Sequence, residues 1–189
     1  MFEYDVIMDE TTQLDVRIEQ ATPATAHLVD CLRSSFVVKA RVRVSMCGDC
    51  YDFDVDSVER PYEKREQPCA DCIYLSKQDA AVYLAFSGDK LVGQVCVQMD
   101  RNRMARIWGL RVEHGHQHHG VATALMNTAR DWALERGLHW LRAETQDIHA
   151  TACMFYRDYG FTIGGFDRLY LQATPGSEGE TTIIWYLRI

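Results

Sequence analysis

A strand followed by a glycine-containing turn and a helix carries the clearest chemistry in this sequence. The turn is Gln117-His118-His119-Gly120-Val121-Ala122, and helical spacing of apolar residues follows it. The first N–H groups of a helix lack partners inside the helix and lie at the positive end of its dipole, so together they bind phosphate oxygens. An ordinary tight turn is the alternative. We predict a pyrophosphate cradle made of Gln117, His118, His119, Gly120, Val121, Ala122 and Thr123.

Histidines crowd this turn, at positions 114, 116, 118 and 119. Two or more of them could bind a metal ion, because imidazole is a common ligand. Hydrogen bonds from the histidines to phosphate oxygens are the favoured interpretation.

Two cysteine pairs form a second pattern with known chemistry. Cys47 and Cys50 are separated by 18 residues from Cys69 and Cys72, a spacing found in zinc sites with four cysteine ligands. We predict a closed, structural zinc ion on these four residues, with a redox pair or buried thiols as alternatives. The zinc would support the segment that carries Tyr62.

Alternating strands and helices must position these residues, which predicts an α/β (α+β) fold. Helices are expected over 22–33, 120–136 and 149–159, the last two ending at Gly137 and Gly160. Residues 57–79 contain prolines and many charges, and we expect them to be irregular. Strands are expected over 14–20, 36–46, 51–56, 82–86, 91–99, 104–112, 138–144, 161–166 and 181–189.

Composition excludes several classes of protein. The net charge of −7 argues against binding of nucleic acid backbones and fits a cationic small substrate. No apolar run is long enough to span a membrane, and the acidic N-terminus does not resemble a signal peptide. We expect a cytoplasmic protein with one domain, residues 1–189, that contains a zinc-knuckle insertion around 47–72; the sequence leaves a homodimer open.

Two motifs together resemble those of the GNAT superfamily of N-acetyltransferases. Gln117-x-x-Gly120-x-Ala122 is similar to the first motif, and Ala152-x-x-x-Tyr156-x-x-x-Gly160-Phe161 is similar to the second. The resemblance implies acetyl-CoA as co-substrate. It also implies the GNAT fold, a mixed central sheet with a splayed strand pair and flanking helices.

A narrower resemblance is to the streptothricin acetyltransferases. It rests on Pro61-Tyr62-x-Lys64, Asn102-Arg103, Asp131-Trp132-Ala133, Glu144-Thr145-Gln146 and Trp185-Tyr186, and covers residues 80–188 well. It implies acetyl transfer to an amine of a small cationic antibiotic. A protein or peptide N-acetyltransferase, and a module that binds acyl-CoA without catalysis, are the rival interpretations.

The GNAT resemblance also implies roles for individual residues. Leu110 N–H would stabilise the oxyanion, with Arg111 and Val112 beside the pantetheine arm, and Gly109 favours a local bulge. Tyr156 would protonate the departing thiolate. His149 stands where relatives carry Asn and is assigned to cofactor binding.

The expected general base is where this sequence departs from the family. Relatives carry acidic residues on the strand before the cradle, whereas this chain has Ile107-Trp108-Gly109. We predict Glu144 as the replacement, with Glu113 and His114 as alternatives. Trp108 would stack on the acceptor, and Tyr62 would also contact it.

Overall fold

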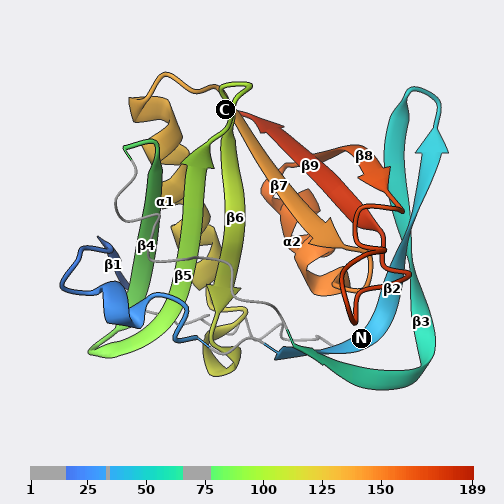
Figure 1. The fold of residues 1–189 in the computed structure, drawn as a ribbon, viewed down its shortest axis with the longest axis horizontal. Helices are drawn as coiled ribbons and strands as arrows, with labels where there is room; N and C mark the ends of the chain where they lie inside the picture. The colour runs from blue at the N-terminus through green and yellow to red at the C-terminus, as the bar shows by residue number, and fades with distance from the viewer. Residues whose placement is uncertain (1–15, 33–34, 66–77) are drawn as a thin grey trace, which may run out of the picture.

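A seven-stranded sheet and a separate two-stranded sheet organise the molecule (Figure 1). The computed structural model describes residues 16–32, 35–65 and 78–189. In the large sheet the strand order is β1-β4-β5-β6-β7-β9-β8, and β2 and β3 form the small sheet. The large sheet consists of β1 (Arg17–Gln20), β4 (Ala80–Ser87), β5 (Lys90–Met99), β6 (Ala105–Val112), β7 (Trp140–Gln146), β8 (Thr162–Asp167) and β9 (Thr182–Arg188).

The central strands β6 and β7 are the parallel pair of this sheet, and they separate along their length. They pair over three rungs, from Ala105 opposite Leu141 to Ile107 opposite Ala143. Beyond Ile107 the two strands diverge, as Figure 1 shows. The edge of β6 that faces β7 therefore has no strand partner there in the described part of the chain. This is the splayed pair that the GNAT resemblance implied, and the mixed sheet confirms the predicted fold class.

Two helices cover one face of the large sheet, close to the predicted positions. Helix α1 (Val121–Glu135) packs on β4, β5 and β6, and helix α2 (Ala150–Tyr159) ends at Gly160 in a left-handed conformation. Gly93 permits close packing of α1, because a Cβ at this position would lie 2.8 Å from Leu125 Cδ1. In the described ranges, neither these helices nor any other is long and apolar enough to cross a membrane.

The small sheet is a long hairpin arm, β2 (Ser35–Cys47) and β3 (Cys50–Arg65), which lies beside β8 and β9 (Figure 1). Its inner face contributes Val42 and Phe53 to the main hydrophobic core. The prediction that the chain is irregular from residue 57 is wrong up to Arg65, where β3 ends. Pro61 is tolerated because it lies at the shift in register between Ser57 and Tyr62, where the ladder with β2 is interrupted.

The predicted helix over 22–33 is also wrong for the described residues, up to residue 32. The segment forms turns and one short 3-10 helix, Ala26–Leu28. The Thr25 hydroxyl accepts a hydrogen bond from Thr22 N–H at 2.9 Å, a local bond that competes with helix formation. Asp30 then adopts a left-handed conformation, with φ of 59°. There its carboxylate accepts from the buried Arg111 guanidinium at 2.9 Å, which fastens this segment to β6.

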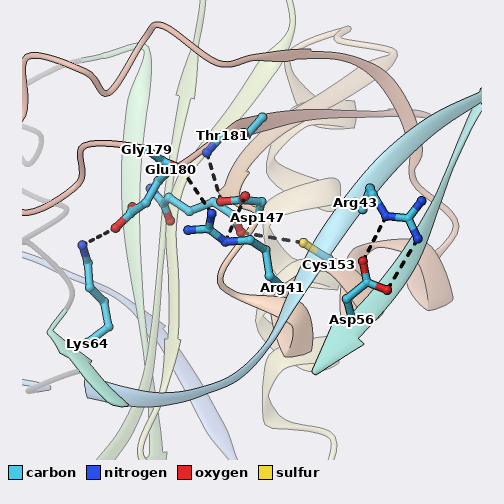
Figure 2. A network of polar contacts seen from close by, with 10 residues as sticks. Arg41, Arg43, Asp56, Lys64, Asp147, Cys153, Gly179, Glu180 and Thr181 are labelled. Carbon is cyan, nitrogen blue, oxygen red and sulfur yellow. Dashed lines mark hydrogen bonds and ion pairs between the residues drawn. The ribbon is translucent and has the colours of Figure 1, made fainter. Parts of the chain in front are cut away.

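Polar contacts attach the arm to the loop before β9 (Figure 2). Lys64 of β3 forms an ion pair with the buried Glu180. Arg41 of β2 lies 3.4 Å from the carboxylate of Asp147, which also accepts from Thr181 N–H at 3.0 Å. These bonds hold the base of the arm beside the end of β7.

Candidate active site

A cavity of about 540 Å³ lies between the second half of β6, the start of α1 and the exposed face of α2. It runs along the edge of β6 from which β7 has diverged. Nine of the residues predicted for coenzyme A and catalysis line it, namely Leu110, Val112, Gln117, His118, Gly120, Ala122, Thr123, His149 and Tyr156.

The turn before α1 has the backbone expected of a phosphate cradle. His118 and Gly120 both adopt positive φ angles, 63° and 82°, and Gly120 is the N-cap of α1. The Gln117 side chain donates to Val112 O at 3.3 Å, which fastens the turn to the end of β6. The first backbone bond of the helix joins Ala124 N–H to Gly120 O, so the N–H groups of the first turn are available to an anion.

Three residues predicted for the cofactor do not line this cavity. Arg111 faces the opposite side of the sheet, where it binds Asp30. Val121 is buried in the core, and His119 Nδ1 bonds to Gln117 O at 2.6 Å. Arg111 and Val121 therefore pack around the cavity without lining it.

One of the histidines near the cradle, His116, is bonded to a carboxylate. His116 lines the cavity, and its Nδ1 lies 2.5 Å from the Glu113 carboxylate, which also accepts from Lys90 at 3.2 Å. These hydrogen bonds, from His116 first and then Lys90, lower the pKa of Glu113. Within the described ranges no three His, Cys, Asp or Glu side chains are grouped closely enough to hold a metal ion.

His149 caps α2 at the mouth of the cavity. Its Nδ1 accepts from Ala152 N–H at 3.2 Å, so the neutral ring carries its proton on Nε2. Phe36, from the base of the arm, lies against the imidazole with ring centroids 3.9 Å apart. Both side chains line the cavity, which makes the arm part of its wall.

Tyr156 lies on the cavity side of α2 and is mostly buried. Its ring stacks on Trp185, with centroids 6.0 Å apart, and contacts Phe161 edge to face. The side chain is therefore held in one place beside the diverging edge of β6.

The diverging point itself carries a charged cluster. Trp108 is the extra residue of a bulge, because Ile107 pairs with Val97 and Gly109 with Cys96. This confirms the bulge expected at Gly109. Arg106 stacks on the Trp108 ring at 3.6 Å and donates to Glu144 at 2.9 Å. Arg142 donates to the other oxygen of Glu144 at 2.6 Å, so both carboxylate oxygens of the predicted base are engaged by guanidinium groups.

Tyr62, Cys47 and Cys50 do not line the cavity. Tyr62 is on β3 opposite Val38 and is 44% exposed. Cys47 and Cys50 face each other across the two-residue turn at the tip of the arm, both exposed and both free thiols. Cys69 and Cys72, the other two predicted zinc ligands, lie outside the described residues.

Sequence reasoning missed part of the cavity wall. Thr151, Met154, Phe155 and Asp158 line it from α2. Their spacing of three, four and seven residues places them on one helix face, a signal that was present in the sequence. Ser35 and Phe36 line it from the arm, and no local pattern reveals that contact, because it depends on how the arm packs.

A β-strand that diverges from its parallel neighbour, beside a helix that begins with a phosphate cradle, defines the GNAT class of acetyltransferases. A model of the acetyltransferase (GNAT) family matches residues 48–161, more than half of the chain. The chain belongs to this family, which confirms the predicted fold and the predicted class of enzyme, an acetyltransferase.

Relatives with assigned activities resemble the chain over most of its length. It is 34% identical to a streptothricin acetyltransferase of Escherichia coli, over 80% of this chain and 84% of that protein. It is 29% identical to streptothricin acetyltransferase A of Bacillus subtilis (strain 168), over 81% of this chain and 88% of that protein.

Solved structures agree with the sequence comparison. A protein from Bacillus anthracis str. Ames, assigned as a streptothricin acetyltransferase and solved in complex with acetyl coenzyme A, superposes with a TM-score of 0.86. The identity is 27%, over 93% of this chain and all of that one. A nourseothricin acetyltransferase superposes with a TM-score of 0.78 at 28% identity, over 92% of this chain and 98% of that one.

Proposed function

We propose that this chain transfers the acetyl group of acetyl-CoA to a primary amine of a streptothricin-type antibiotic. The observation that carries the proposal is the cavity along the diverging edge of β6, with the start of α1 at one end. The names of the relatives, and the acetyl coenzyme A bound to one of them, support the choice of both substrates.

The cavity provides a separate environment for each part of acetyl-CoA. The N–H groups at the start of α1, opened by Gly120, would bind the pyrophosphate. Leu110 and Val112 offer an apolar wall to the pantetheine arm. His149 lines the cavity at the start of α2 and would contact the cofactor there.

The reaction forms an N–C bond and breaks the C–S bond of the thioester. Leu110 N–H, on the open edge of β6, would stabilise the oxyanion. The attacking ammonium would first lose a proton to solvent water and become the neutral amine. Tyr156 would then give a proton to the departing thiolate and regain one from the nitrogen of the amide that forms. Because both oxygens of Glu144 bind guanidinium groups, we assign Glu144 to positioning Arg106 and Arg142, in place of the predicted role as base.

The proposed function is tested by thiol release from acetyl-CoA in the presence of streptothricin, polyamines and lysine-containing peptides. We expect release with streptothricin at a rate well above the rate of hydrolysis. Release with peptides alone would indicate a peptide N-acetyltransferase. Binding of acetyl-CoA without turnover of any amine would indicate a module that has lost catalysis.

The structural zinc ion and the homodimer stay predictions. The zinc prediction is tested by metal analysis of purified protein against the double variant C47S/C50S. About one zinc per chain, lost in the variant, would support the assignment. No zinc in protein prepared with excess metal would refute it.

A further inference from the structure

Two arginines stand side by side where the central strands diverge. Arg106 of β6 and Arg142 of β7 are register partners in the short parallel ladder. Register partners lie on the same face of a sheet, here the face away from the core residues Ala105 and Ile107. Like charges opposite each other on neighbouring strands destabilise a sheet unless an anion separates them.

Glu144 supplies one anion for the two cations. It accepts from both guanidinium groups, and the three side chains are only 18% to 21% exposed. The residues beside them on β5 and β9, Gln98, Ile184 and Tyr186, are neutral. The cluster therefore keeps a net charge of +1 in a partly desolvated position.

The guanidinium groups also keep donors for a second anion. Each guanidinium has five N–H donors, and Glu144 takes one from each arginine. Among the described residues, Glu144 is the acceptor that these two arginines share, and they bond to no other. Trp108 holds Arg106 by stacking and is itself fixed by a 3.0 Å hydrogen bond from Nε1 to Gln98.

The position of the cluster links it to the acceptor. Glu144 and Trp108 are the first residues beyond the last paired rung of β6 and β7. They face away from the core side of the sheet, on which the cavity and α2 lie. An acceptor that reaches the thioester through the gap between the strands would pass these arginines.

We infer that the site also acetylates amines that carry a carboxylate a few bonds from the nitrogen, such as free amino acids. The carboxylate would bind the spare donors of Arg106 and Arg142, a geometry that suits planar guanidinium groups, and would balance the +1 charge. This inference rests on the proposed function, since it needs acetyl transfer.

The test compares acids with their amides as acceptors. β-Alanine and 6-aminohexanoate are each measured beside the corresponding amide, by thiol release at saturating acetyl-CoA, with streptothricin as the reference acceptor. We expect kcat/KM for the better acid to exceed that of its amide about tenfold, the size of one charge-assisted hydrogen bond. Amides that react as fast as the acids would overturn the inference.

Two variants test whether Arg106 and Arg142 cause the preference for acids over amides. Arg142→Gln and Arg106→Gln should each bring the ratio of acid to amide close to one while KM for acetyl-CoA is unchanged. Arg60→Gln, an exposed arginine on the arm, should keep the ratio of the wild type. A preference for acids that survives in both cluster variants would also overturn the inference. Turnover of streptothricin without turnover of any acid overturns the inference alone, whereas no turnover of any acceptor overturns the proposed function as well.

Discussion

The imidazole of His149 accepts the N–H of Ala152 at 3.2 Å and thereby caps helix α2, in a cavity wall that Phe36 completes. A side chain that caps a helix is worth about 1 kcal/mol. We predict that His149→Leu lowers the free energy of unfolding by about 1 kcal/mol, because the N–H of Ala152 loses its acceptor.

His149→Asn is the matched control for this prediction. Asn is among the best residues at an N-cap, so this variant should unfold at the same urea concentration as the wild type. Equal stability of the Leu and Asn variants would show that the cap contributes nothing.

Gly120 begins α1 with φ of 82°, a conformation that a residue with Cβ adopts at a cost of about 1–2 kcal/mol. We predict that Gly120→Ala loses stability and also binds acetyl-CoA more weakly, at least about fivefold, because the cradle is distorted. Calorimetric titration with acetyl-CoA measures the affinity.

Gly88→Ala is the control that distinguishes the effect of backbone strain on stability from an effect on the affinity for acetyl-CoA. Gly88 has φ of 57° in the turn between β4 and β5, and it does not line the cavity. This variant should lose similar stability and keep the affinity for acetyl-CoA. Equal affinities for all three proteins would show that Gly120 does not shape the binding site.

Cys153 is fully buried on α2, and burial raises the pKa of its thiol to about 11. Because thiolate is the reactive form, this cysteine should resist iodoacetamide at pH 8, while the exposed Cys31, which is not a predicted zinc ligand, reacts. Peptide mapping by mass spectrometry, with and without urea, measures the labelling. Rapid labelling of Cys153 in the folded protein would contradict the burial.

Asp147 connects the pH dependence of stability to the junction between the arm and β7. Burial raises its pKa above the ordinary value, against the opposing effects of the Thr181 N–H and Arg41. A carboxyl with a raised folded pKa favours folding most below its unfolded pKa of 3.8, and this contribution is lost as pH rises through the folded value. The stability of Asp147→Asn relative to the wild type should therefore increase as the pH rises from 4 to 7.

Asp56→Asn provides a comparison of opposite sign. The hydrogen bond and charge of Arg43 lower the pKa of Asp56, so its contribution is present above 3.8 and lost as pH falls. This variant should lose stability relative to the wild type at pH 7, by a small amount because the pair is exposed. Urea unfolding at the two pH values measures both variants, and the same trend in both would contradict the assignment.

Local patterns were sufficient to predict α1 and the turn that precedes it. The periodic apolar residues from Val121 to Trp132 and the closing Gly137 located α1 within a residue or two of its bounds. The Gln117-x-x-Gly120-x-Ala122 motif located the turn that begins α1, since such a turn is built from consecutive residues.

Long-range contacts explain what the sequence did not predict. The segment from Thr22 to Asp30 has helix-start residues, but its conformation is fixed by the bond of Asp30 to Arg111 on a distant strand. Likewise, Glu144 was predicted as the base, and only the register of β6 and β7 brings Arg106 to it, whereas Arg142 is its neighbour on the same face of β7.

We expect the cavity beside β6 to hold acetyl-CoA and to deliver its acetyl group to an amine. Mass spectrometry of streptothricin after incubation with the protein and acetyl-CoA tests it most directly. We expect a product heavier by one acetyl group, formed in step with free thiol and strongly reduced by Gly120→Ala and by Tyr156→Phe. Unmodified streptothricin after many equivalents of enzyme and hours of incubation would contradict it.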